Sequence, residues 1–451
     1  MDIKLITPFD IVYASILFFI ILSYGNNIKK KYVELKPYYK NYSRGLIIKL
    51  LGGIVFCLIY AFYYKGGDTV NYYKGVNAMI AVFKDNPITY IKLLFQNHTA
   101  FARNAYYEVA AYPPTYMVND MRTYTVIKIS SLFALPGLGG FLPTTVLLSA
   151  FIYNWVWKFY TFVVERYPNS LRSANIAILY LPSTVFWGSG IMKDTFSFGA
   201  TCYLVYGLHH CFVNRKKIIR LLIPLLFSFY LIITIKSYIM FALLPGLLIF
   251  ANFERLKSIK SNFVKIFILP ISIGIIVLIA NTLFFDFEEL FGKYSANNLF
   301  EEAAIQNADL QRDVYGSNSF SIGEFEPTFD GVLSKFLPAI NAAMFRPYIW
   351  ESGSLTMLIS GVENTFLLVL ALWALFTRPL KILKFVRDDP FLIFCVLFTL
   401  ILGFGIGLST SNFGALVRYK IPFLPFFVFL ILHNLKMFSP NDMNSVELKV
   451  E

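Results

Sequence analysis

Long apolar stretches recur from one end of this chain to the other, separated by short basic loops. About ten of them reach or approach the roughly 20 apolar residues that a helix needs to cross a bilayer. Hydrophobic residues make up 57% of the 451 residues and charged residues only 15%, which is more apolar surface than a soluble domain can bury. The sequence therefore predicts an all-α, polytopic membrane protein, with residues 1–451 forming a single integral membrane domain.

The net charge of +13 lies largely in short loops between the apolar stretches, which argues against nucleic-acid binding. Basic clusters at 29–31, 215–217, 255–265 and 378–387 are typical of loops on the cytoplasmic side of a membrane. The four cysteines lie in or beside apolar stretches and have no disulfide or metal-site spacing. We therefore expect an external N-terminus and a cytoplasmic C-terminus.

This orientation requires an odd number of crossings, and eleven apolar segments fit it. Segment 124–138 is short, carries Lys128 and ends in a glycine-rich turn, so we expect a re-entrant or interfacial helix there. The alternative is a twelfth crossing with an internal N-terminus. Two sizeable external loops are expected at about 65–123 and 286–359. The predicted spans are 8–24, 46–64, 141–163, 173–190, 194–213, 219–235, 237–252, 264–285, 360–377, 390–408 and 419–435.

A polar cluster with two glycines follows the second predicted span and contains Asp68 and Tyr72. Because the glycines let the backbone turn sharply, Asp68 could approach a ligand closely, as a general base or as a ligand to a cation. The alternative is an ordinary turn in which Asp68 caps the next helix.

A second polar cluster, 182–194, lies where two predicted spans meet. Its Gly-Ser-Gly sequence breaks the helix, and the positive end of the following helix, with Lys193 beside it, favours an anion. The alternative is a simple turn with an interfacial Trp187 and a Lys193 that extends towards the headgroups. Lys236, between two adjacent spans, is a further cation with the same two interpretations.

A third polar cluster precedes and enters a late span. Arg346 offers bidentate binding to phosphate, and Trp350 offers an aromatic face for sugars or isoprenes. Glu351 and Glu363 are carboxylates at the membrane mouth, where a raised pKa would suit an acid or base. The alternative is an interfacial amphipathic helix anchored by Arg346 and Trp350.

The last predicted span opens with a fourth cluster that includes Arg418 and Lys420. A charge at the start of an apolar run is costly unless it is partnered, so Arg418 could hold a diphosphate from the membrane side; the alternative is a plain interfacial anchor. Histidine is almost absent from this face, which argues against a histidine metal site or proton relay. We expect no metal and no cofactor.

Three of these segments, GGDTVNYY, PSTVFWGSGIMKD and RYKIPFLPFF, are similar to segments of bacterial exopolysaccharide and O-antigen polymerases. The closest likeness is to the EpsG-like and Wzy-type membrane proteins. The resemblance implies a GT-C-like helical fold in the bacterial cytoplasmic membrane and polymerisation or transfer of glycan repeat units carried on undecaprenyl diphosphate. It also implies that Asp68, Lys193 and Arg418 are functional residues.

We therefore expect a glycosyltransferase whose partners are a lipid-linked oligosaccharide, membrane lipids and other polysaccharide-assembly proteins. Three alternatives stay open: a polyprenyl-phosphate-sugar-dependent transferase of the same fold, a lipid-linked saccharide transporter or flippase, and a structural subunit of an envelope assembly. The predicted catalytic carboxylates are Asp68, Glu351 and Glu363. The predicted substrate-binding residues are Lys193, Lys236, Arg346, Arg418, Lys420, Tyr72, Trp187 and Trp350.

Overall fold

The computed structural model describes residues 5–96, 100–212, 218–258, 299–311, 318–377 and 389–435. Over these ranges every regular element is a helix, and extended pairing is limited to one isolated bridge between Ser319 and Asn412. The prediction of an all-α protein is therefore confirmed. The chain divides into two compact units, the first formed mainly by residues 1–206 with 223–236 and the second by 207–222 with 237–437.

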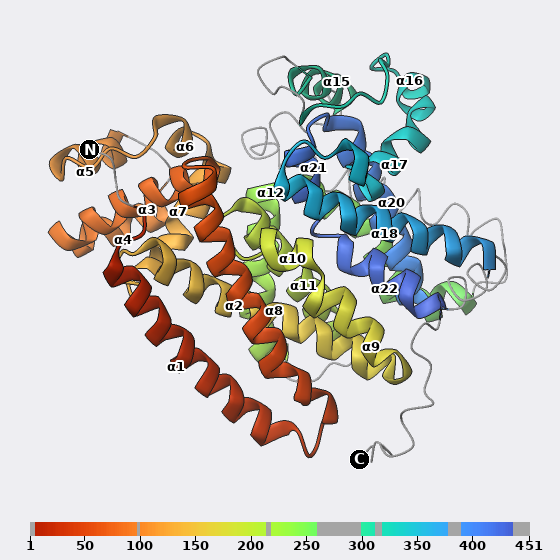
Figure 1. The fold of residues 1–451 in the computed structure, drawn as a ribbon, viewed down its shortest axis with the longest axis horizontal. Helices are drawn as coiled ribbons and strands as arrows, with labels where there is room; N and C mark the ends of the chain where they lie inside the picture. Colours follow the sequence, from red (N-terminus) through yellow and green to blue (C-terminus); the bar gives the residue numbers. More distant parts are fainter. Residues whose placement is uncertain are drawn as a thin grey trace. The chain divides into compact units, whose positions relative to one another are not determined.

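Long apolar helices frame the first unit. Helices α1 (Pro8–Tyr32) and α2 (Tyr42–Leu58, extended by the π-helical turn Ile59–Tyr63) pack against each other and against α8 (Phe141–Arg166) (Figure 1). Each is rich in Leu, Ile and Phe, and α1 also has a defined start. The Thr7 hydroxyl accepts from a first-turn amide while Pro8 supplies a helical φ, so the helix starts where the apolar run starts.

Five shorter helices connect α2 to α8 and gather at one end of the α1–α2 pair (Figure 1). The first four and the start of the fifth occupy the segment predicted as the first loop, which is therefore largely helical. Side chains cap two of them: Asn86 begins α4 and Asp120 begins α7. The helices are α3 (Asp68–Asp85), α4 (Pro87–Phe95), α5 (Ala100–Glu108), α6 (Thr115–Asn119) and α7 (Met121–Ala134).

Helix α7 covers residues 124–134 of the segment 124–138 that we expected to be re-entrant or interfacial. It has 14 residues, too few to cross a bilayer that needs about 20. A turn follows it in which Leu138 and Gly139 both have positive φ. The helix packs on α3 and α8, so it is a buried short helix of the first unit.

The rest of the first unit is a run of interrupted helices. The predicted span 173–190 is a short helix, α9 (Leu171–Ala174), then a π-helical segment (Asn175–Tyr180), then α10 (Pro182–Trp187). Pro182 has no amide hydrogen and restricts the residue before it, so the helix restarts there. After a turn, α11 (Lys193–Phe212) continues the chain.

Helix α12 (Ile218–Ser258) covers two predicted spans, 219–235 and 237–252, in one element. Lys236 has φ −146° and ψ 72°, which are not helical values, so the element is two helices joined at a kink. One boundary between the two units falls at this kink, with Ile223–Lys236 in the first unit and Ser237 onwards in the second.

The second unit combines apolar helices with short helices and a structured loop. The predicted second loop contributes α15, α16, α17 and the turn η8 to it, in the part of that loop that the structure describes. Asn412 and Asp389 begin their helices by accepting backbone hydrogen bonds. The elements are α15 (Leu299–Asp309), α16 (Phe329–Ser334), α17 (Phe336–Phe345), η8 (Ile349–Glu351), α18 (Leu355–Thr377), α20 (Pro390–Ser409), α21 (Phe413–Tyr419) and α22 (Leu424–Leu435).

Six helices in the described ranges are long and apolar enough to cross a membrane. The pair α21 and α22, bent by 70°, makes a seventh if it counts as one span. Of the eleven expected spans, 173–190 is interrupted at Pro182, 219–235 and 237–252 lie in one element, α12, and 194–213, which is α11, is not among the six, so the count of eleven is not confirmed. The predicted span 264–285 lies outside the described residues.

Candidate functional site

The chain between α10 and α11 leaves the helical path at residues 188–192, as the glycines there predicted. A break inside a membrane domain exposes carbonyl groups that no water can satisfy, so other donors must replace the lost helical amides. The structure provides those donors from α2, α8 and α11.

Lys49 on α2 is a buried, charged donor at this break. Its Nζ donates to the carbonyl oxygens of Gly188 (2.5 Å) and Thr184 (3.3 Å). Ser149 Oγ on α8 donates to the carbonyl of Ser189 at 2.8 Å. The sequence analysis did not single out Lys49, although a single charge inside an apolar run is a signal of a functional or structural role.

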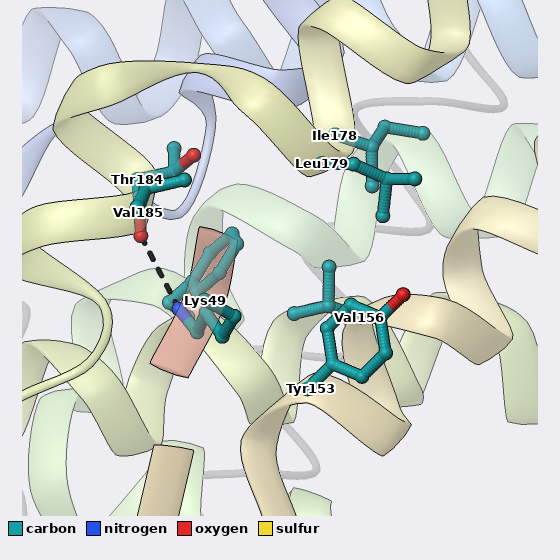
Figure 2. Close-up of a pocket in the computed structure, with 8 residues that line it drawn as sticks. Lys49, Tyr153, Val156, Ile178, Leu179, Thr184 and Val185 are labelled. Atoms are coloured by element: carbon teal, nitrogen blue, oxygen red, sulfur yellow. Dashed lines mark hydrogen bonds between the residues drawn. The ribbon is translucent and has the colours of Figure 1, made fainter. Parts of the chain in front are cut away.

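Figure 2 shows the small cavity beside Lys49, with the dashed line marking its bond to the Thr184 carbonyl. The ammonium group also lies 5.1 Å from the centre of the Phe198 ring. Because Lys49 is buried and its charge is directed at carbonyl oxygens and a ring face, it supports the helix break. The cavity is lined by Lys49, Tyr153, Val156, Ile178, Leu179, Thr184, Val185 and Phe198.

Two ion pairs hold the start of α11, which contributes the cation to one pair and the carboxylate to the other. Lys193 Nζ lies 2.9 Å from a carboxylate oxygen of Asp120, which begins α7. The next residue, Asp194, forms an ion pair with Lys236 at the kink of α12, and both side chains are buried. The positive end of α11 therefore already has a carboxylate in its first turn, where we expected an external anion to bind.

Asp120 has no local sequence signal that predicts its role, because its partner is 73 residues away in the sequence. Burial alone would raise the pKa of its carboxyl group. The charge and hydrogen bond of Lys193, with hydrogen bonds from Thr123 and the Arg122 amide, outweigh this and hold the pKa below its ordinary value. Asp120 is therefore an ionised partner for Lys193.

The first predicted carboxylate, Asp68, is exposed in the first turn of α3. Gly67, with φ 97°, precedes it as the helix cap, so Asp68 is inside the helix and the capping alternative is wrong in detail. Its charge acts on the Tyr116 hydroxyl, which accepts a hydrogen bond from the Asn71 amide at 2.6 Å. Tyr72 is buried, and so its ring is part of the packing of α3.

Trp187 ends α10 and is also buried, packed against Phe56 and Phe186. Its ring therefore contributes to the core of the first unit rather than to an exposed aromatic belt.

In the second unit, Arg346 and Glu351 form a half-buried, bidentate ion pair. Arg346 Nε lies 2.9 Å and 3.1 Å from the two oxygens of Glu351, and Nη2 lies 2.5 Å from one of them. The Tyr348 amide donates to the same carboxylate at 2.9 Å. The guanidinium also lies over the rings of Phe320 (4.5 Å) and Phe413 (5.3 Å), which cover it.

Helix α18 holds the loop that carries this pair. The Asn364 amide donates to the Pro347 carbonyl at 3.1 Å, and the Thr365 hydroxyl accepts from the Ile349 amide at 3.1 Å. A Cβ on Gly361 would collide with the Tyr348 carbonyl, so the loop lies directly on the helix at that point. Residues 361, 364 and 365 share one helix face, which explains why they fix the same loop.

Lys420 lies in the turn between α21 and α22 and is fully buried. Its Nζ donates to Asn364 Oδ1 at 2.6 Å and to the Arg346 carbonyl at 3.3 Å. The negative charge of Glu363 attracts the Lys420 ammonium group. Lys420 thus supports the Arg346 loop from behind, a position that burial separates from any ligand at the surface.

Arg418 and Trp350 are more accessible than Lys420. Arg418 is partly exposed, and its Nε donates to the Gly414 carbonyl at 3.1 Å. Trp350 is 71% exposed and stacks on Tyr348 with ring centres 4.9 Å apart. The Tyr348 hydroxyl donates to Asn341, so the stacked pair is fixed in place.

Most of the predicted site residues therefore fall into two groups, and Asp68, Tyr72 and Trp187 belong to neither. In the first unit, two ion pairs surround the start of α11: Lys193 with the unpredicted Asp120, and Lys236 with Asp194. In the second unit, Arg346, Trp350 and Glu351 lie on one loop that Lys420 supports, Glu363 acts on Lys420, and Arg418 lies on α21, whose Phe413 covers Arg346. Over the ranges that the structure covers, no group of three His, Cys, Asp or Glu side chains is placed to hold a metal ion.

No protein-family model matches the chain, and no curated protein or solved structure is significantly similar to it. The fold itself defines an all-helical protein with several apolar helices, the architecture of a multi-pass membrane protein.

Proposed function

We propose that the protein transfers or polymerises glycan units carried on a polyprenyl diphosphate, with the Arg346 loop of the second unit as the substrate site. The supporting observation is that an arginine, a carboxylate and a fixed aromatic pair lie together on one loop. Cations suit the diphosphate, and stacked aromatic rings provide an apolar face for a pyranose. The finer expectations, a GT-C-like fold with eleven spans in the bacterial cytoplasmic membrane, are part of this proposal.

The proposed reaction is a displacement at the anomeric carbon of the donor sugar. The hydroxyl oxygen of the acceptor sugar forms a bond to that carbon while the bond from carbon to the diphosphate oxygen breaks. The polyprenyl diphosphate leaves with the bonding electron pair, and the hydroxyl proton passes to a carboxylate. Arg346 and Arg418 would neutralise the leaving group, which is the kind of charge stabilisation that preorganised groups provide.

Glu363 is the proposed proton acceptor of the second unit, since Glu351 is held by Arg346 in this structure. Asp68 is the carboxylate proposed for the first unit because its side chain is exposed. We propose Lys193 as a substrate-binding residue that would have to exchange Asp120 for a phosphate.

The test is a glycan-chain-length assay in membranes that contain lipid-linked repeat units. Arg346→Ala and Arg418→Ala should each lower the rate by about 10²–10³, the cost of removing one group that stabilises developing charge. Asp68→Asn and Glu363→Gln identify the proton acceptor. The control is Glu165→Gln, which removes a carboxylate from an exposed ion pair with Lys36 in the first unit. Unchanged polymer from Asp68→Asn, Glu363→Gln and Arg418→Ala together would reject the proposal.

A transporter for lipid-linked saccharides is a second candidate, favoured by the helix breaks. Charged residues lie at the break before α11, at the kink of α12 and at the 70° bend between α21 and α22. Discontinuous helices with charged groups at their breaks are typical of transporter binding sites. Vesicles that contain the purified protein and a fluorescent lipid-linked saccharide discriminate: a transporter moves the lipid between leaflets without lengthening the glycan.

A further inference from the structure

We infer that Glu351 occupies a binding site for a phosphoryl group, formed by Arg346 Nε, Arg346 Nη2 and the Tyr348 amide, and that the phosphoryl ligand binds by displacing it. These three donors are called the Arg346 site below. The inference deepens the proposed function, on which it rests for the identity of a polyprenyl diphosphate as ligand.

The geometry of the Arg346 site is that of an anion site with an internal occupant. Three N–H donors from two residues point at one carboxylate, with distances from 2.5 to 3.1 Å. A planar guanidinium binds carboxylate and phosphate in the same forked manner, because both present two oxygens to it. A phosphoryl group can therefore use the donors that Glu351 uses now.

The donors are fixed independently of Glu351, so the site persists when the carboxylate leaves. Lys420 holds the Arg346 carbonyl and Asn364 holds the Pro347 carbonyl. The rings of Phe320 and Phe413, stacked with centres 4.9 Å apart, lie against the guanidinium. An arginine positioned in this way loses little side-chain freedom when it exchanges one anion for another.

The pair is also accessible enough to exchange its anion. The side chains of Arg346 and Glu351 are 20% and 18% exposed, unlike the Asp194–Lys236 pair, whose side chains are 6% exposed or less. Glu351 lies in a short turn after Tyr348, and rotation of its side chain alone would free the three donors.

The experiment compares diphosphate binding by the purified full chain in nanodiscs, with inorganic diphosphate as the probe. Glu351→Gln keeps an oxygen for the Tyr348 amide but removes the competing charge. If the carboxylate occupies the site about 90% of the time, its loss tightens diphosphate binding about tenfold. Arg346→Lys, which has no fork, should weaken binding at least tenfold. Glu165→Gln is the control and should bind as the unaltered protein does.

The Glu351→Gln variant is compared with the unaltered protein in thermal unfolding, so that a folding defect is recognised. If it does not fold, Glu351→Asp replaces it, since a side chain shorter by one methylene cannot reach both guanidinium nitrogens and should give a smaller gain. Diphosphate binding that is no tighter in the folded Gln or Asp variant overturns the inference. So does binding by Arg346→Lys equal to that of the unaltered protein.

Two sources of the phosphoryl group are distinguished by adding polyprenyl diphosphate to the nanodiscs. Competition with inorganic diphosphate assigns the Arg346 site to the lipid headgroup, and no competition assigns it to a free phosphate compound. The outcomes also separate the two proposals. Variants that alter diphosphate affinity but not glycan length reject the function and support the site, and the reverse result rejects the site alone.

Discussion

The buried ion pair between Asp194 and Lys236 allows a quantitative test of how the first unit is held together. Changing Lys236 to Met removes the ammonium but keeps a long apolar side chain in its place. The two side chains are 6% and 4% exposed, so the Asp194 carboxylate would be left largely without water. Breaking a buried pair by removing one partner costs about 3–5 kcal/mol, because the other charge stays buried.

The double variant Lys236→Met with Asp194→Asn separates the loss of the pair from the cost of the remaining charge. It removes both charges, so we expect it to recover about 2–3 kcal/mol relative to the single variant. The measurement is the free energy of unfolding in mixed detergent micelles, followed by tryptophan fluorescence. The matched control is the exposed pair Lys36–Glu165, where Lys36→Met should cost no more than about 1 kcal/mol.

If Lys236→Met costs no more than Lys36→Met, the buried charge is not retained as the structure indicates. If the double variant is as unstable as the single one, the loss comes from packing of the lysine stem rather than from an uncompensated carboxylate.

Three further predictions concern other parts of the chain. The pKa of Asp120 lies below its ordinary value of 3.8, so the Lys193–Asp120 pair should stabilise the fold fully above about pH 4 and lose this effect as the pH falls further. Unfolding curves of the Asp120→Asn variant should lack this acid-dependent loss of stability. Gly407→Ala should destabilise the second unit by about 1–3 kcal/mol or more in thermal unfolding, since the new methyl group would overlap the Ala339 backbone. The control, Gly403→Ala, should be near neutral in that assay, because its methyl group would meet neighbours only at 3.8 Å. Trp350→Ala should lower glycan transfer with little effect on the unfolding midpoint, because the ring is 71% exposed; a large fall in the midpoint would instead assign the ring to packing.

The apolar pattern of the sequence predicts the uninterrupted helices well. The spans predicted at 141–163 and 390–408 match α8 (Phe141–Arg166) and α20 (Pro390–Ser409), since composition and length alone define such helices. The interrupted helices are different. A kink at Lys236 depends on a buried carboxylate from another helix, and no local pattern contains that information.

The sequence also predicted only some of the residues of the candidate site. Arg346 and Glu351 were recognised because both lie in one short polar segment. Lys420 is buried under this segment because it bonds to Asn364, 56 residues away in the sequence, and because the last helix bends there. Neither fact can be read from the residues around Lys420. Asp120 was missed for the same reason, because ordinary loop composition surrounds it while its partner Lys193 is distant.

The break before α11 has a consequence for motion. If residues 188–192 closed into a continuous helix, their carbonyls would bond to backbone amides; the Lys49 ammonium would then lose the Gly188 carbonyl and the Ser149 hydroxyl would lose the Ser189 carbonyl. Each such bond lost by a donor in a dry interior costs about 1–3 kcal/mol, more for the charged donor. The groups around residues 188–192 therefore oppose a change of this turn into a helix. We expect the turn to keep its conformation if the neighbouring helices move.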